Sequence, residues 1–324
     1  MNLRRQGGVG EVGRVLILNT LAPVFLLIAI GTGLQASGFL SAGFLKEANR
    51  VTYWLGLPAL LFTQLVGSLH GAGGATGMLG GMLLATGGVI AVGYLVAGMM
   101  GVGEGVAGTF VQGAFRGNLA FVGLPIIYAM PDVTVVGGIS LRAAAVLTVA
   151  PMMVVYNVAG VMVLLLSQHR LGWAMLRPFL RQLATTPPLI ASLAGIAFAL
   201  LGWQLPVAVN RAFISLGEMA LPLGLLGVGG SLVTVKFGGA WRAPLAAALL
   251  KTAVAPALGW VAGRWLGLGA VELKTMMIFL ATPSAVISYT MAVQMKGDEM
   301  LASGAIVLST LTSVVTLAVI VGVF

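Results

Sequence analysis

The stretch Gly113-Ala-Phe-Arg-Gly-Asn-Leu-Ala-Phe-Val-Gly-Leu-Pro125 decides the interpretation of the whole chain. It lies within an apolar run, about residues 106–130, that is long enough to cross a bilayer. The run nevertheless contains a charge at Arg116 and an amide at Asn118. A charged side chain at mid-membrane costs roughly 2.5 to more than 10 kcal/mol, so we expect Arg116 to face a cavity or a partner. Gly117 and the final proline both weaken a helix, and backbone groups freed in lipid must find other partners.

A second stretch of the same character, Phe279-Leu-Ala-Thr-Pro-Ser-Ala-Val-Ile-Ser-Tyr-Thr290, lies in the second half of the chain. It combines an apolar run with a helix-breaking proline, Pro283, and several polar side chains. Two interrupted spans at matching places in two halves are typical of the binding site of a secondary transporter. The pair therefore indicates a substrate site where the two interrupted helices meet.

The composition places the chain in a bilayer. Hydrophobic residues make up 59% of the 324 residues and charged residues only 8%, against about 25% charged residues in soluble domains. The apolar runs are long and do not alternate, which predicts an all-α membrane protein. The net charge of +9 comes mostly from basic residues in short loops. It therefore indicates charge that flanks the membrane and no nucleic-acid partner.

No motif for catalysis, a cofactor or a metal is found in the sequence. Cysteine is absent, and the two histidines, His70 and His169, are far apart. Fragments such as Gly101-x-Gly103 lack the strand–turn–helix context of a nucleotide-binding loop. No paired carboxylates are placed for acid–base work. We therefore expect that the protein is not an enzyme and uses neither a cofactor nor a metal.

Ten transmembrane helices are predicted from the apolar runs. Their approximate ranges are 15–34, 51–69, 77–100, 106–130, 139–166, 187–203, 207–234, 242–264, 272–295 and 301–324. Residues 1–14 are expected to form a short tail. The segment 167–186 is basic and amphipathic, which is typical of a linker on the membrane face. It separates a first five-helix repeat, 15–166, from a second one, 187–324.

The two halves show a weak internal similarity. Met100-Gly-Val-Gly103 precedes the fourth predicted span, and Leu266-Gly-Leu-Gly269 precedes the ninth. Aligning these tetrads puts Gly117-Asn118 opposite Pro283-Ser284. Because each half has an odd number of spans, the second repeat is expected to be inverted relative to the first. The alternative is chance similarity between apolar, glycine-rich segments. Basic residues in the loops favour a cytoplasmic position for the segment 167–186, whereas the arginines of the N-terminal tail argue for the opposite orientation.

Polar residues inside the predicted spans are the candidate substrate-binding residues, because intramembrane polar groups are functional candidates by default. They are Asn118, Gly117, Arg116, Pro283, Ser284, Lys251, Tyr156 and Asn157. The half-helices that begin at the two breaks would present free N–H groups and a partial positive charge. With Arg116 or Lys251 nearby, a carboxylate is the substrate group that such a site would favour.

Three of these candidates, Lys251, Gly117 and Asn118, also have a structural alternative. Glu218 and Lys251 could form an ion pair that only stabilises the fold. The pattern Gly113-x-x-x-Gly117 could be a helix-packing motif. Asn118 could act as a helix cap with no ligand role.

The quoted motifs resemble a known family. The sequence Arg116-Gly-Asn-Leu-Ala-Phe-Val-Gly-Leu-Pro125 resembles the fourth-span motif of the auxin efflux carriers, and Ala281-Thr-Pro-Ser284 resembles the matching ninth-span motif. The resemblance implies a bacterial-type member whose two inverted five-helix repeats cross through broken helices 4 and 9. It also implies a scaffold of spans 1, 2, 6 and 7, a moving transport unit of spans 3–5 and 8–10, and a homodimer formed through the scaffold.

This chain departs from the plant members of that family at one position of the motif. Gly117 stands where the plant carriers have the crossover proline, so Asn118 and Pro283 match the motif and Gly117 matches in position only. The long hydrophilic central loop of many plant members is also missing. Auxin itself is therefore not the expected substrate. The resemblance implies small organic anions, such as the dicarboxylates suggested for bacterial members.

We therefore expect a secondary transporter of small carboxylates that works by an elevator type of alternating access. It would be a multi-pass protein of the plasma or inner membrane. One alternative is a sodium-coupled organic-anion symporter of the bile acid:sodium symporter type, which would need carboxylates and amides clustered at the crossing point. Another is a membrane-embedded enzyme or a structural membrane protein.

Overall fold

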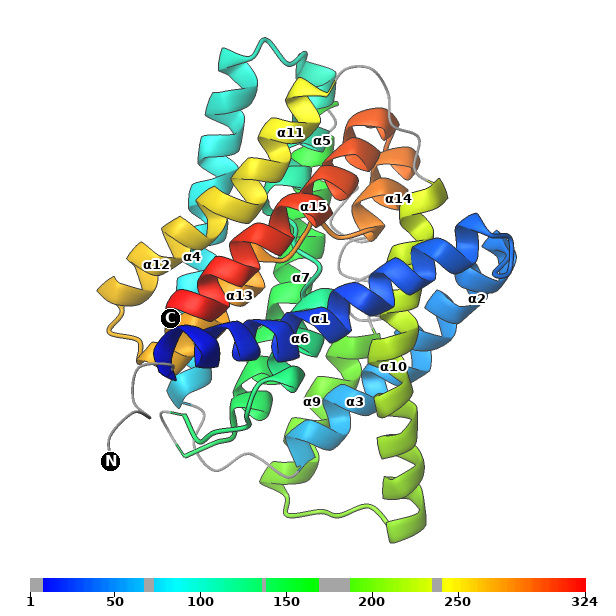
Figure 1. Ribbon diagram of the computed structural model, residues 1–324, viewed down its shortest axis with the longest axis vertical. Helices are drawn as coiled ribbons and strands as arrows, with labels where there is room; N and C mark the ends of the chain where they lie inside the picture. Colours follow the sequence, from blue (N-terminus) through cyan, green and yellow to red (C-terminus); the bar gives the residue numbers. More distant parts are fainter. Residues whose placement is uncertain (1–7, 67–72, 136–137, 169–186, 235–240) are drawn as a thin grey trace, which may run out of the picture.

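A computed structural model describes residues 8–66, 73–135, 138–168, 187–234 and 241–324 (Figure 1). In these ranges the regular structure is helical, and the only β-type pairings are two isolated bridges. The predicted all-α class is therefore confirmed for the part of the chain that is described. Almost all of the predicted linker, 167–186, lies outside it.

Helices overlap every predicted span. In the first half they are α1 (Gly8–Ala36), α2 (Ala42–Val51), α3 (Leu57–Val66), α4 (Gly73–Met99), α5 (Glu104–Phe115), α6 (Leu124–Ala129) and α7 (Leu141–Ser167). In the second half they are α9 (Pro187–Leu200), α10 (Val207–Thr234), α11 (Arg242–Leu249), α12 (Ala255–Trp265), α13 (Ala270–Ala281), α14 (Ile287–Gln294) and α15 (Glu299–Val323). Helix α1 begins at Gly8, so it includes the second half of the predicted tail 1–14.

Six helical segments are long and apolar enough to cross a membrane by themselves. They are Asn19–Ala36, Ala75–Met99, Leu141–Ser167, Val207–Val233, Arg242–Trp265 and Glu299–Val323. Two shorter apolar helices, Leu119–Ala129 and Ile190–Leu200, complete this set among the described residues. The first of these, Leu119–Ala129, contains the second half of the motif with which the sequence analysis began, and the first half belongs to α5, which ends at Phe115, so this span is interrupted.

In the described ranges, three short π-helical segments interrupt the longer helices, and each has a proline two residues beyond its end. They are η1 (Thr52–Gly56), η2 (Leu119–Gly123) and η4 (Leu250–Val254), followed by Pro58, Pro125 and Pro256. A proline has no N–H to donate and its ring clashes with the carbonyl four residues earlier. A wider π turn at that point removes the clash without ending the helix. Such segments are frequent at functional sites, and η2 lies in the motif itself.

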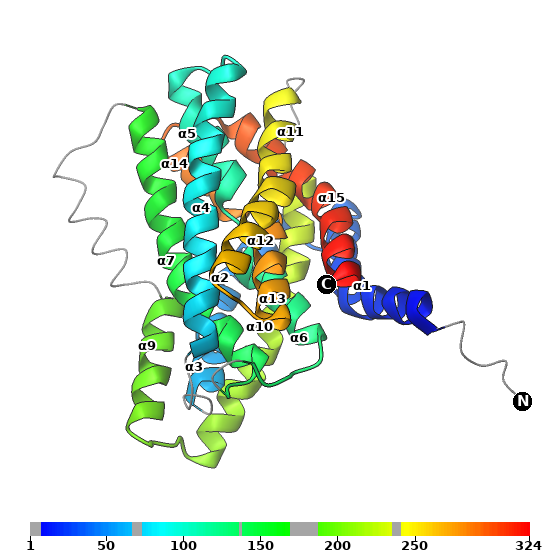
Figure 2. The ribbon, with the colours of Figure 1, turned by 90° about the vertical axis from the view of Figure 1, so that its left-hand side faces the viewer.

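The helices pack as two groups. In one group α1 packs on α10, and α3 packs on both α9 and α10. In the other group α4 packs on α12, α5 on α7, and α11 on α15. Figure 1 shows α4, α11 and α12 on one side of the molecule and α3, α9 and α10 on the other. The 90° view of Figure 2 shows α4 and α7 running side by side.

Glycines allow the closest helix contacts, as the composition suggests. A Cβ at Gly229 on α10 would lie 1.9 Å from the carbonyl oxygen of Ile28 on α1. The hydroxyl of Thr32 donates to the Gly229 carbonyl at 2.9 Å across the same contact. These two backbones therefore touch over a surface where any larger side chain would force them apart.

Candidate functional site

Two broken helices cross at the centre of the molecule. Helix α5 ends at Phe115 and the chain becomes helical again at Leu119, while α13 ends at Ala281 and α14 begins at Ile287. Between the breaks, Gly117 and Ser284 form an antiparallel bridge. The N–H of Asn118 donates to the Pro283 carbonyl at 2.8 Å, and the N–H of Ala285 donates to the Arg116 carbonyl at 2.9 Å. The predicted interruption of both spans, with residues 117 and 283 close together, is thus confirmed.

The two half-helices that lead to this crossing are built alike. Helices α5 and α13 each have 12 residues, and their N-caps are Gly103 and Gly269. These are the last residues of the two aligned tetrads. The first glycine of each tetrad, Gly101 or Gly267, has a positive φ of 65° or 69°, which suits glycine because it has no Cβ. The tetrad similarity therefore reflects two equal turns into two equal helices.

Sequence determines where each half-helix ends. Thr282 precedes a proline, which disfavours the α conformation, and its backbone is extended with φ −56° and ψ 147°. Gly117 is required for a different reason, because a Cβ there would lie 2.5 Å from the Thr282 hydroxyl oxygen and 2.8 Å from Cε of Lys251. Gly117 thus allows the two chains to touch.

Ser284 forms hydrogen bonds that connect the crossing to α5 and α15. Its hydroxyl donates to the Gly113 carbonyl of α5 at 2.6 Å. Its N–H donates to the hydroxyl oxygen of Ser309 on α15 at 2.8 Å. Ser284 and Pro283 therefore form the frame of the crossing, and neither lines the cavity beside it.

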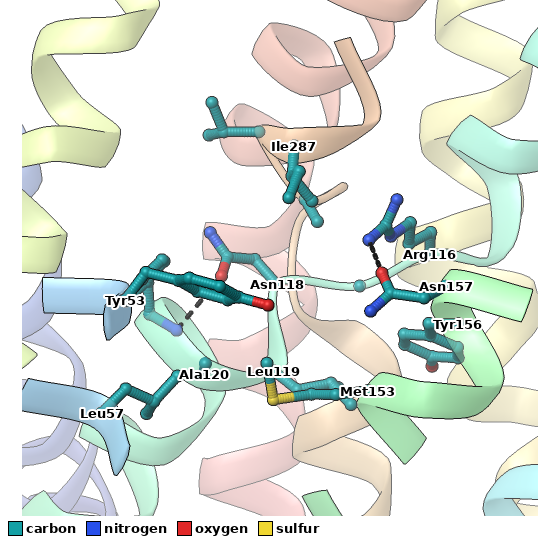
Figure 3. A pocket seen from close by; sticks show the side chains of 14 residues that line it. Tyr53, Leu57, Arg116, Asn118, Leu119, Ala120, Met153, Tyr156, Asn157 and Ile287 are labelled. Atoms are coloured by element: carbon teal, nitrogen blue, oxygen red, sulfur yellow. Dashed lines mark hydrogen bonds between the residues drawn. The ribbon is translucent and has the colours of Figure 1, made fainter. Parts of the chain in front are cut away.

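A cavity of about 100 Å³ lies against one face of this crossing (Figure 3). Tyr53 and Leu57 line it from the second span, and Met153, Tyr156 and Asn157 line it from α7. The two broken segments contribute residues 116–121 and 285–287. Of the eight predicted site residues, the cavity brings together Arg116, Gly117, Asn118, Tyr156 and Asn157.

Arg116 carries the charge of the site. It is only 4% exposed, and its guanidinium donates to the side-chain oxygen of Asn157 and to the sulfur of Met291. No carboxylate lines the cavity, and no ion pair of Arg116 occurs within the described ranges. Its neutral partners hold the guanidinium in place and leave its positive charge uncompensated.

Asn118 has the capping role that was left open as its alternative. Its side-chain oxygen accepts the N–H of Phe121 at 3.1 Å and so caps η2. In the described structure its NH₂ group has no hydrogen-bond partner, and the residue lines the cavity. One end of the amide therefore serves the backbone, and the other end is free to donate.

Lys251 does not line this cavity. It is fully buried, and its ammonium group donates to the Leu280 carbonyl at the end of α13. The suggested ion pair between Lys251 and Glu218 is not found among the described residues: Lys251 is fully buried, whereas Glu218 is exposed and lines another cavity. Arg116, and not Lys251, is the cation that faces the cavity.

The comparisons with known proteins agree with this architecture. A protein family described as membrane transport protein matches residues 16–321. The chain belongs to this family. It is the auxin efflux carrier and membrane transport family, which the motifs around Asn118 and Pro283 indicated. Together with the apolar helices, the match makes the chain a multi-pass membrane transporter. No curated protein matches the chain.

A second cavity of the transporter, of about 530 Å³, lies between the two helix groups. Gln64 of α3 and Glu218 of α10 line it from one group, and Tyr128 of α6 and Arg142 of α7 line it from the other. Arg142 donates to the Tyr128 carbonyl at 3.0 Å and lies over the ring of that tyrosine. The two cavities share no lining residue.

Sequence reasoning missed nine of the fourteen residues that line the first cavity of the transporter, among them Tyr53 and Met153. Tyrosine and methionine occur at any position of an apolar helix, so their residue type alone does not mark a site. One signal could have found Tyr53, namely its place in the π segment that Pro58 induces. Tyr156 was identified, and its ring packs edge-on against Phe115 at 5.7 Å between centroids.

Proposed function

We propose that the protein is a secondary transporter of small carboxylates, which bind at the crossing of the two broken helices. One observation carries this proposal: the buried guanidinium of Arg116 borders a cavity and has only neutral hydrogen-bond partners in the described structure. A positive charge in such a place is expensive unless an anion compensates it part of the time. An anionic substrate would supply that compensation.

The donors around the cavity suit a carboxylate. A guanidinium offers several N–H groups in a planar fork that matches two carboxylate oxygens. Asn118 also lines the cavity, and its NH₂ group adds a neutral donor. Figure 3 shows Arg116 and Asn157 on one wall of the cavity and Tyr53 on the opposite wall, with Asn118 between them. A carboxylate between Arg116 and Asn118 would be bound from two sides.

The size of the cavity supports a small substrate. Its volume of about 100 Å³ is well below the roughly 300–1,000 Å³ that is typical for drug-sized ligands. A large organic anion of the kind carried by bile acid:sodium symporters would therefore not fit, which disfavours that alternative. No carboxylate lines the cavity, so the cluster of carboxylates and amides that the sodium-coupled alternative would need is missing from its lining.

The helix packing supports an elevator mechanism on a scaffold of spans 1, 2, 6 and 7. These spans correspond to α1, α2–α3, α9 and α10, which pack on one another. The remaining helices, including both broken spans, would move as the transport unit. Tyr53 and Leu57 are the cavity residues on the scaffold side, and the other lining residues are on the moving side. Sliding between the two groups would therefore change which side of the membrane reaches the bound carboxylate.

The same proposal includes the complete membrane architecture. Ten spans would form two inverted five-helix repeats, and the antiparallel pairing of Gly117 with Ser284 supports an inverted relation. A homodimer through the scaffold and a place in the plasma or inner membrane follow from the family's properties.

Transport assays with Arg116 variants test the proposal. Purified protein in proteoliposomes would be given labelled mono- and dicarboxylates, with and without ion gradients. Arg116→Met should raise the substrate Kd roughly 10- to 100-fold, since a charge-assisted hydrogen bond is worth about 1.5–3 kcal/mol. Arg50→Met is the matched control, because Arg50 is an exposed arginine that pairs with Glu47 at 3.6 Å. If no carboxylate is transported, or if both variants bind the substrate equally well, the proposal fails.

A further inference from the structure

The carbonyl groups at the end of α13 are the starting point. A helix leaves its last carbonyls without intrahelical partners, and inside a membrane they need partners from elsewhere. The hydroxyl of Thr282 donates a hydrogen bond to the Phe279 carbonyl at 2.7 Å. The next carbonyl, that of Leu280, accepts from the ammonium group of Lys251. A side chain of another helix thus completes the end of this half-helix.

The other broken helix has a neutral partner near its end. Gly113, the tenth residue of α5, corresponds to Phe279, the tenth residue of α13. The Gly113 carbonyl accepts from the hydroxyl of Ser284 at 2.6 Å, as the Phe279 carbonyl accepts from that of Thr282. Both half-helix ends therefore have a hydroxyl donor, and α13 has the cation of Lys251 in addition.

Among the described residues, no charged side chain forms an ion pair with Lys251. The Lys251 side chain is fully buried. The carboxylates on the helices packed around it, Glu104, Glu272 and Glu299, all lie in the first turns of their helices. The Leu280 carbonyl lies in the last turn of α13, where the negative end of the helix dipole favours a cation.

This is the kind of place where a coupling cation binds. In transporters with broken helices, the C-terminal ends of half-helices and freed backbone carbonyls coordinate the coupling ion. We propose that the ammonium group of Lys251 is a built-in cation that occupies this place, so that transport needs neither sodium nor potassium. The lysine sits in the π segment η4, and Cε approaches the Gly117 position closely enough to exclude any Cβ there. A free ion would have to displace this side chain.

The statement about transport rests on the proposed function as a carboxylate transporter. An experiment that replaces the cation of the medium tests it. Wild-type protein in proteoliposomes should transport at equal rates, within twofold, in sodium, potassium or choline salts. Lys251→Ala removes the ammonium group and leaves space for a free cation beside the Leu280 carbonyl. Its rate should fall at least tenfold in choline and recover severalfold in sodium or methylammonium. Lys251→Met fills the place with an apolar side chain of similar length, so its rate should stay low in every salt.

Lys274 offers a matched control. It is also buried, and its ammonium group donates to a carbonyl near the end of a helix, that of Val321 on α15, at 2.9 Å. This contact lies away from the crossing. Lys274→Ala should therefore show no cation requirement in transport. A cation-dependent rate in Lys274→Ala equal to that of Lys251→Ala would show that the effect is general and would overturn the inference.

A substrate-free measurement separates the inference from the proposed function. Sodium should raise the melting temperature of detergent-solubilised Lys251→Ala relative to choline, because a ligand that binds only the folded state stabilises it. Wild type and Lys251→Met should show no such rise. If wild type transports no carboxylate but this sodium effect holds, the proposed function fails and the cation place stands. The inference is overturned if wild-type transport requires sodium, if Lys251→Ala transports normally in choline, or if folded Lys251→Ala responds to no cation in either assay.

Discussion

The backbone N–H of Asn118 donates to the carbonyl of Pro283 at 2.8 Å, so the residue that caps one half-helix is held by the residue that ends the other. The relation places the Asn118 amide at the junction of the two broken spans and beside the cavity. Any change in the pairing of residues 116–118 with 283–285 would therefore move the amide and the guanidinium of Arg116 together. The first two predictions concern this junction.

Asn118→Asp should abolish carboxylate binding in a folded protein. Aspartate caps a helix as well as asparagine does, so the contact with the Phe121 N–H would be kept. A carboxylate in the cavity would, however, repel an anionic substrate. Equilibrium binding and thermal unfolding of the variant would be measured side by side. Near-normal binding by a well-folded Asn118→Asp protein would show that Asn118 only caps η2 and does not bind the substrate.

A cap elsewhere provides the control for this experiment. Asp298 caps α15 by accepting the Leu301 N–H at 2.8 Å, and it does not line the cavity. Asp298→Asn exchanges the same two side chains in the opposite direction. It should leave substrate binding unchanged, which would show that the exchange acts through the cavity and not through helix capping.

Gly117→Ala should destabilise the protein and stop transport. The added Cβ would lie 2.5 Å from the Thr282 hydroxyl oxygen, and overpacking of this kind costs about 1–3 kcal/mol. Unfolding in detergent and transport in proteoliposomes would measure the two effects. Gly33→Ala is the control, since Gly33 is an exposed glycine of α1 with no atom within 4 Å of its Cβ position. That variant should be as stable as wild type or slightly more stable.

Glu218→Gln should keep the substrate Kd within about twofold of wild type. Glu218 lines the larger cavity, which shares no residue with the cavity at the crossing. A change of about twofold corresponds to roughly 0.4 kcal/mol, which is ordinary for a site that does not touch the ligand. Isothermal titration or a radioligand assay would measure it. A tenfold loss of affinity would mean that the larger cavity contributes to substrate binding.

Ala120→Leu should block the larger carboxylates before the smaller ones. Ala120 lines the crossing cavity and is 6% exposed, so added carbon atoms would occupy part of its volume of about 100 Å³. Competition by carboxylates of increasing length would be compared between variant and wild type. Ala91→Leu on the exposed face of α4 is the control and should change nothing. An equal loss for all chain lengths would place the substrate elsewhere.

The breaks in the two spans could be predicted because their signals are local. Pro283 acts on the backbone next to it, and the tetrads that end at Gly103 and Gly269 mark the starts of the half-helices. The alignment of these tetrads put Gly117-Asn118 opposite Pro283-Ser284, and these two pairs meet in the structure, Gly117 with Ser284 in the bridge and Asn118 with Pro283 through a hydrogen bond. Which N–H and carbonyl groups bond across the crossing could not be predicted, because no local sequence signal determines it.

Which of the two buried cationic side chains faces the cavity could not be predicted. Arg116 and Lys251 both lie in apolar spans, and the sequence gives no reason to assign the cavity to either one. The rotation of η4 about its axis turns Lys251 towards α13, and that rotation results from the packing of whole helices. Tyr53 was missed for a similar reason, since an aromatic residue in an apolar span becomes part of a site only through its neighbours.

The pairing of residues 116–118 with 283–285 also constrains how the protein is made. The first broken span leaves the ribosome long before its partner exists, with the N–H of Asn118 and the carbonyl of Arg116 unmatched. Unsatisfied backbone groups are costly in hydrocarbon, so this span cannot settle fully in the bilayer until the second half of the chain has been synthesised. The final step of membrane insertion is therefore the joining of the two halves, and a fragment that stops before Pro283 would remain incompletely inserted and exposed to quality-control proteases.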